Sequence, residues 1–207
     1  MASRSVTRFA RLSALLSVTI LVAAVGQASP ALAGAASGDL WVVGDSITYL
    51  SASTLLPRLE STVTGDVTID GLGGRPVANL DDLVKKELAS RHPPAVMVLA
   101  LGTNPSPGWG FGDYQRVVDS IPDETVVVLV TVYRTPRAGD AGTRRILGKY
   151  SRWMRSIARD RSNVCLADWR ATARRHPGAL LVDGVHPTAR GERIWSSTIR
   201  RAVERCE

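Results

Sequence analysis

Histidine and cysteine are scarce in this sequence, with 3 and 2 copies in 207 residues. Neither Cys165 nor Cys206 has a histidine near it in the sequence, which argues against a catalytic cysteine. A histidine that acts as a general base must be His92, His176 or His186. The sequence also has no nucleic-acid-binding motif and no aromatic residues interleaved with its basic ones, so we expect no nucleic-acid partner.

No stretch after residue 33 is long and apolar enough to span a membrane. Before that point, three arginines precede an apolar run over residues 14–25, and Ala31-Leu32-Ala33 has the small-x-small pattern of a cleavage site. These features predict a secretory signal peptide over residues 1–33, with an uncleaved anchor as the alternative. We therefore expect a secreted protein whose remaining 207 − 33 = 174 residues, 34–207, form a single domain.

Positive charge is in excess, with 26 Lys and Arg against 19 Asp and Glu. The expected signal peptide holds three of the arginines and no acid, so the remaining chain has a balance of (26 − 3) − 19 = +4. Much of this charge lies over residues 144–161, where apolar residues recur at helical spacing. The pattern predicts a helix with a solvated basic face. The alternative is a weak association of this face with an anionic wall polymer or membrane surface.

Short apolar runs alternate with helical patterns along the chain. The expected strands cover residues 40–43, 67–70, 95–101, 125–132 and 164–167, and the expected helices cover 54–60, 80–90, 113–120, 144–161, 171–175 and 189–205. This alternation predicts an α/β fold, a three-layer α/β/α sandwich with a five-stranded parallel sheet. We expect the flavodoxin-like strand order 2-1-3-4-5 and a monomer.

The first expected strand ends in Gly44-Asp45-Ser46. A serine at the carboxyl end of a buried strand is well placed as a nucleophile, but it is equally well placed as the N-cap of the next helix. A nucleophilic serine needs a base to take its proton and donors to hold the oxyanion. Because the first and third strands are neighbours in the expected order, Asn104, which follows the third strand, should lie near Ser46.

His186 is the strongest candidate for the base. It lies in Asp183-Gly184-Val185-His186-Pro187, where the glycine allows the chain to fold back and Asp183 can hold the Nδ1–H of the imidazole. His92 and His176 each precede a proline, and a structural role suits them better.

Three kinds of group could stabilise an oxyanion. The backbone N–H of Ser46 is one, and the side-chain amide of Asn104 is another. The third is a backbone N–H of Gly71, Gly73 or Gly74, because a glycine backbone can approach a ligand closely. The pattern does not decide among these glycines, and each could instead serve only a tight turn.

These segments together resemble the SGNH hydrolase superfamily, also called GDSL-type esterases and lipases. Gly44-Asp45-Ser46 matches the serine block, Gly74 with Arg75 best matches the glycine block, Gly102-Thr103-Asn104 matches the asparagine block, and Asp183 to His186 match the Asp-x-x-His block. Position 48 is threonine, so the Gly-x-Ser-x-Gly elbow of ordinary α/β-hydrolases is absent.

The resemblance implies a secreted serine esterase that needs no metal and no organic cofactor. Ser46 would be the nucleophile, His186 the base and Asp183 its orienting acid, with Ser46 N–H, Gly74 N–H and Asn104 as oxyanion donors. The substrate would be a small acyl ester or an acylated glycan or lipid. The alternatives are an acyltransferase that moves the acyl group to a cell-wall sugar, and a non-catalytic glycan-binding module on the same scaffold.

Two further segments resemble one branch of that superfamily, the SGNH domains of bacterial membrane acyltransferases that modify wall sugars. They are Ile69-Asp70 with Arg75, and Ala167-Asp168-Trp169 ahead of the histidine–proline turn. Asp168 is therefore a second candidate for the orienting acid, although its place at a strand end favours a structural role.

The two cysteines form a candidate disulfide. An even cysteine count in a secreted chain favours a bond, and Cys206 continues the apolar stripe of the last expected helix. A bond to Cys165 would close a loop of about 40 residues and contribute roughly 4 kcal/mol in the chain-entropy model. Two inert core thiols are the alternative.

Overall fold

The fold is built on a five-stranded parallel sheet. The computed structural model describes residues 36–90, 92–138 and 141–206, so the expected signal peptide lies outside the described residues. The strands are β1 (Leu40–Gly44), β2 (Val67–Gly71), β3 (Val96–Ala100), β4 (Val126–Val130) and β5 (Val164–Ala167). Every pairing is parallel and the order is β2-β1-β3-β4-β5, which confirms the predicted topology.

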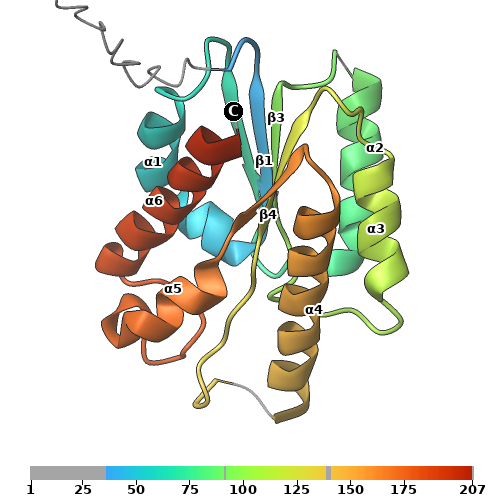
Figure 1. Cartoon of the computed structure of the whole chain (residues 1–207). Helices are drawn as coiled ribbons and strands as arrows, with labels where there is room; N and C mark the ends of the chain where they lie inside the picture. The colour runs from blue at the N-terminus through green and yellow to red at the C-terminus, as the bar shows by residue number, and fades with distance from the viewer. Residues whose placement is uncertain (1–35, 91, 139–140, 207) are drawn as a thin grey trace, which may run out of the picture. The chain divides into compact units, whose positions relative to one another are not determined.

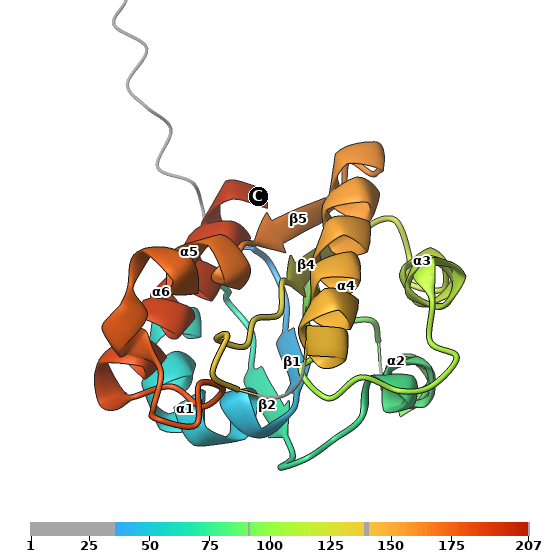
Figure 2. The same ribbon diagram turned by 90° about the horizontal axis from the view of Figure 1, so that it is seen from below.

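Helices cover both faces of the sheet (Figure 1). On one face lie α1 (Ser46–Leu59), α5 (Trp169–Arg175) and α6 (Ala189–Cys206). On the other lie α2 (Leu80–Ser90), α3 (Phe111–Asp119) and α4 (Ala141–Asp160), and the view from below separates the same two groups (Figure 2). Two short 3-10 turns, Val77–Asn79 and Pro177–Ala179, complete the described elements.

The core consists of two apolar layers, one on each side of the sheet. Along β1 and β3, Val42 and Val98 pack into the layer under α1 and α6, whereas Val43 and Leu99 pack into the layer under α2, α3 and α4. Because alternate side chains of a strand point to opposite faces, a strand covered on both sides must be apolar at every position. This explains why the central strands are continuous apolar runs.

Helix α1 begins earlier than the sequence pattern predicts, at Ser46 instead of residue 54. Its N-cap is Asp45, whose Oδ1 accepts a hydrogen bond of 3.1 Å from the N–H of Ile47. The alternative that Ser46 is merely the N-cap is therefore wrong, because the preceding residue has that role. The turn from β1 into α1 is tight, since a Cβ at Gly44 would lie 1.8 Å from Thr48 Oγ1.

The carboxyl-terminal end of the chain is joined to the edge of the sheet. Cys165 in β5 and Cys206 at the end of α6 form a disulfide with a Cα–Cα distance of 5.8 Å. No helix in the described part of the chain combines the length and the apolar character needed to cross a membrane.

Candidate active site

Ser46, His186 and Asp183 form a hydrogen-bonded chain at the carboxyl edge of the sheet. His186 Nε2 lies 2.9 Å from Ser46 Oγ, and His186 Nδ1 lies 2.7 Å from Asp183 Oδ2. When Nδ1–H donates to the carboxylate, Nε2 is free to accept the serine proton. This arrangement suits a serine nucleophile with a histidine base and an orienting acid.

The loop that carries Asp183 and His186 is closed on itself and anchored to the segment after β4. Leu181 N–H donates to the carbonyl of His186 at 2.8 Å, and Gly184 N–H donates to that of Leu181 at 2.9 Å. Thr135 N–H donates to the Gly184 carbonyl at 2.9 Å. Gly184 has φ +70°, and a Cβ there would lie 1.9 Å from Thr135 Oγ1, so only glycine lets the loop approach this closely.

Asp183 remains ionised near neutral pH. Slight burial raises the pKa of Asp183, but hydrogen bonds from the backbone N–H of Val185 and from His186 outweigh this and hold it below its usual value. The side chains of Asp183 and His186 are 44% and 34% exposed, so the pair lies in an open site. An ionised carboxylate in this position stabilises the imidazolium that forms when the histidine takes a proton.

Asn104 lies beside the glycine-rich loop. Its side-chain Nδ2 donates to the backbone carbonyl of Arg75 at 3.2 Å. The backbone carbonyl of Asn104 accepts from Val77 N–H at 3.0 Å. Gly74 has φ +70°, with nothing within 4 Å of the position its Cβ would take. Within the described residues the N–H groups of Gly73 and Gly74 have no hydrogen-bond acceptor. Both therefore remain candidate oxyanion donors.

Gly71 has a different role from the other two glycines. It is the last residue of β2, and a Cβ there would lie 2.5 Å from the backbone nitrogen of Tyr49. Its lack of a side chain allows β2 to pack against the first turn of α1, which explains this glycine without any part in catalysis.

Two arginines that the sequence did not identify as site residues hold the oxyanion region in place. Arg75 is 8% exposed and donates to the carbonyls of Gly44 and Asp70 and to the Asp70 carboxylate, at 3.1, 2.9 and 2.7 Å. Arg134 donates to the carbonyl of Thr103 at 2.8 Å and to Asn104 Oδ1 at 3.2 Å. The only sequence signal for Arg134 is its place in the polar segment that follows β4.

Asp168 binds other residues and has no hydrogen bond to Ser46, His186 or Asp183 among the described residues. Its carboxylate binds Arg155 at 2.8 and 2.9 Å, accepts from Thr131 Oγ1 at 2.9 Å and caps α5 through Ala171 N–H. Partial burial raises the pKa of Asp168, but the hydrogen bonds from Arg155, Ala171 and Thr131 outweigh it and lower the pKa. These contacts join α4, the residue after β4 and the start of α5, which is a structural role.

Asp45 is the most deeply buried carboxyl group near Ser46, with no exposed surface. Burial raises the pKa of Asp45, and the hydrogen bond from the Ile47 N–H opposes this rise only in part. The buried carboxyl group therefore serves as the N-cap of α1.

Comparison with known proteins relates this arrangement to named families. Residues 42–194 match the GDSL-like Lipase/Acylhydrolase family. The chain is 25% identical over 169 residues to a protein of Bacillus subtilis (strain 168) named "Putative peptidoglycan O-acetyltransferase YrhL". The match covers 80% of this chain but 24% of that relative, so the chain spans about a quarter of its length.

Solved structures share the fold. One is the C-terminal catalytic domain of Streptococcus pneumoniae peptidoglycan O-acetyltransferase A, with a TM-score of 0.71, 22% identity, and coverage of 84% of this chain and 96% of that one. Another is an acetylxylan esterase of Geobacillus stearothermophilus, with a TM-score of 0.64, 19% identity, and coverage of 82% and 95%. The family match spans most of the described residues, so the chain belongs to the GDSL-like lipase/acylhydrolase family and is an SGNH-type serine hydrolase that acts on esters.

Proposed function

We propose that this protein is a secreted esterase that removes acetyl groups from a cell-wall polysaccharide. The observation that carries the proposal is the contact of His186 Nε2 with Ser46 Oγ, with Asp183 behind the imidazole. The open site supports a polymeric substrate, since a buried pocket would exclude a sugar chain. Named relatives that act on peptidoglycan or acetylxylan support an acetyl ester.

The proposed reaction has two steps. Ser46 Oγ attacks the acetyl carbonyl while His186 Nε2 takes the hydroxyl proton, and the oxyanion is held by Ser46 N–H, Gly74 N–H and Asn104 Nδ2. The C–O bond to the sugar breaks, the sugar oxygen receives the proton from His186, and an acetyl-serine remains. Water then attacks this ester with His186 as base, and acetic acid and free Ser46 are released.

The test uses p-nitrophenyl acetate, a fluorophosphonate label and the Ser46→Ala variant. We expect wild-type protein to hydrolyse the ester and to take up the label, and the variant to do neither while it keeps the wild-type circular dichroism spectrum. Loss of Ser46 should lower kcat by several orders of magnitude, as in other enzymes with a Ser-His-Asp triad. Hydrolysis that survives in the variant would refute the assignment. A wild-type protein that binds glycan but takes up no label would instead be a binding module.

Acetyl transfer to a sugar is the second candidate, because two of the relatives carry the name peptidoglycan O-acetyltransferase, one of them as "Putative". The exposure of His186, whose side chain is 34% accessible, favours water as the acceptor, since solvent reaches the base. Free acetate and acetylated oligosaccharide should be measured in the same reaction with wall oligosaccharides present. Acetate as the main product supports the hydrolase, and acetylated sugar supports the transferase.

A further inference from the structure

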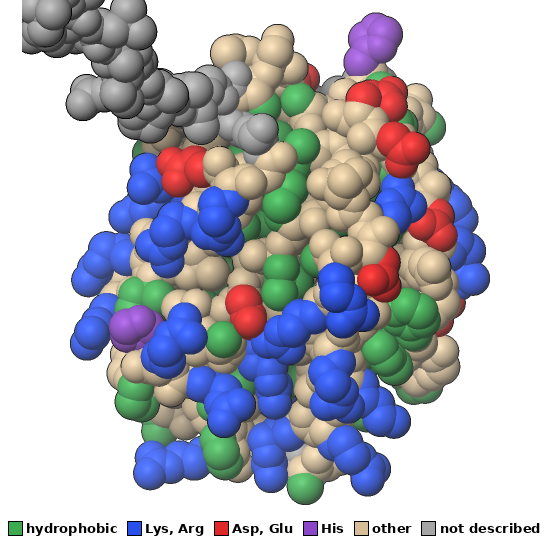
Figure 3. Space-filling model, viewed as in Figure 1, with side chains coloured by type: hydrophobic (Ala, Val, Ile, Leu, Met, Phe, Trp, Pro, Cys, Tyr) green, Lys and Arg blue, Asp and Glu red, His purple; other side chains and the backbone are tan. Residues whose placement is uncertain are grey.

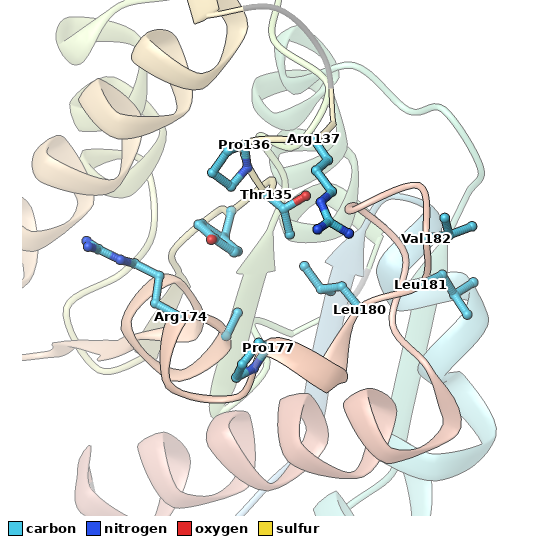
Figure 4. Close-up of a pocket in the computed structure, with 10 residues that line it drawn as sticks. Thr135, Pro136, Arg137, Arg174, Pro177, Leu180, Leu181 and Val182 are labelled. Atoms are coloured by element: carbon cyan, nitrogen blue, oxygen red, sulfur yellow. The ribbon is translucent and has the colours of Figure 1, made fainter.

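A cavity of about 500 Å³ opens beside the loop that carries Asp183 and His186 (Figure 4). One wall is Leu180, Leu181 and Val182, which lead directly into Asp183. The opposite wall is the segment after β4, including Thr135, whose N–H holds the Gly184 carbonyl. The volume lies in the range of sites that bind small molecules. A ligand in this cavity would therefore lie against both segments that position the imidazole.

The charge around the cavity is positive. Arg137 and Arg174 line it from opposite sides, and no acidic residue is among the described residues that line it (Figure 4). Arg170 lies over the ring of Tyr133, another lining residue, at 5.7 Å from its centroid. Within residues 36–90, 92–138 and 141–206, none of these three arginines has a carboxylate partner.

The same positive charge extends over the neighbouring elements. A Cβ at Gly148 would lie 3.7 Å from both Arg152 Nη1 and Arg170 Nη2, so these guanidinium groups lie near one another. Asp168 is occupied by Arg155 and does not neutralise them. Partial burial and the charges of Arg174, Arg155 and Arg152 lower the pKa of Arg170. Figure 3 shows lysine and arginine side chains gathered over the lower half of the molecule, around α4 and α5. Arginines held together without acids favour an anionic ligand.

We propose that this cavity binds the carboxylate of an acidic sugar in the glycan substrate, with Arg137 and Arg174 as its ligands. The inference rests on the proposed function, because it places the acidic sugar next to the acetylated unit at Ser46. Arginine binds carboxylates through charge-assisted and often bidentate hydrogen bonds. The apolar side chains of Pro136, Pro177 and Leu180 supply a surface for the sugar ring. The substrate is thus an acidic glycan, not a neutral one such as xylan.

The experiment compares two substrates that differ only in charge. One is an O-acetylated disaccharide of N-acetylglucosamine and N-acetylmuramic acid with a free lactyl carboxylate, and the other is its methylamide. We expect a kcat/KM for the carboxylate about tenfold or more above that for the amide, the scale of one charge-assisted hydrogen bond. In Arg137→Gln/Arg174→Gln the ratio of the two values should fall to about one.

The matched control is Arg201→Gln/Arg205→Gln, which removes the same net charge from exposed positions in the last turns of α6, neither of which lines the cavity. It should keep the wild-type ratio. Because each ratio is taken within one variant, partial unfolding cancels from the comparison.

The outcomes separate the two proposals. Equal kcat/KM for both disaccharides in the wild type, or a preference that survives in Arg137→Gln/Arg174→Gln, would overturn the subsite while leaving the esterase intact. Failure to hydrolyse either disaccharide or p-nitrophenyl acetate overturns the proposed function and the subsite with it. A last experiment measures how much of each protein sediments with phosphatidylglycerol vesicles. If the double variant loses vesicle binding but keeps its preference for the carboxylate, the arginines serve a membrane surface and the subsite is wrong.

Discussion

Replacement of Arg134 by alanine should slow catalysis without weakening substrate binding. The guanidinium donates to Asn104 Oδ1 at 3.2 Å and to the Thr103 carbonyl at 2.8 Å. Because arginine is only a donor, it can face the oxygen of the amide but not its nitrogen, and it therefore fixes which way Asn104 faces. One N–H of Asn104 then binds the Arg75 carbonyl and the other is left for the oxyanion.

The size of the effect follows from the contacts that remain. Loss of one oxyanion donor costs about 10²–10³ in kcat. Without Arg134 the amide keeps its bond to the Arg75 carbonyl, so its orientation is loosened and not abolished. We expect kcat for p-nitrophenyl acetate to fall about tenfold, which corresponds to about 1.4 kcal/mol, with KM little changed. Both hydrogen bonds come from Nη2 of Arg134, so the ammonium group of Arg134→Lys can replace them only in part, on a shorter and more flexible side chain, and this variant should fall between the wild type and Arg134→Ala.

A double-mutant cycle with Asn104→Ala tests the reasoning. If Arg134 acts only through Asn104, the double variant should be no slower than Asn104→Ala alone. Losses that multiply would refute this, and so would a raised KM with unchanged kcat, which indicates a substrate contact instead. Thermal unfolding of each variant provides the control for a general loss of structure.

Two further predictions concern stability. The Cys165–Cys206 bond spans 41 residues, so Cys165→Ala/Cys206→Ala should lower the free energy of unfolding by about 4 kcal/mol. Thermal scans should show the midpoint lower by roughly 8–16 °C, while kcat is retained. Because the pKa of Asp168 is lowered in the folded protein, its stabilising effect is complete above the unfolded pKa of about 3.9 and is lost as pH falls through the folded value. Asp168→Asn should therefore destabilise by about 1 kcal/mol in urea titrations at pH 7, with a smaller difference at pH 3; an equal difference at both would contradict this.

The strands and their order could be predicted because a strand covered on both faces has a simple signature. The start of α1 could not. Thr48 and Ser51 are fully buried, so the inner face of its first turns is polar and lacks the apolar spacing that marks a helix. The helix is specified instead by the Asp45 cap and by packing on β2, and that packing depends on contacts distant in sequence.

The residues of the active site also include some that the sequence predicts and some that it does not. The position of Ser46 at the end of the first strand and the short spacing of Asp183 and His186 were enough to predict the three groups that the structure joins by hydrogen bonds. Arg75 was noted only as part of the family resemblance, and the contacts of both Arg75 and Arg134 were beyond that reasoning, because an arginine in a loop is normally solvated. Only the folded chain shows that their guanidinium groups turn inward to backbone carbonyls of the serine and asparagine segments.

The cap at Asp45 and the chemistry at Ser46 depend on each other. The first N–H groups of a helix have no partner within the helix, and an N-cap side chain satisfies one of them. Asp45 takes the N–H of Ile47, while the N–H of Ser46 has no acceptor among the described residues. If the serine were itself the N-cap, its hydroxyl oxygen would accept a hydrogen bond from a backbone N–H of the helix. Because Asp45 takes over the cap, the hydroxyl of Ser46 is free for His186, and its N–H stays free at the positive end of the α1 dipole, where an oxyanion is favoured.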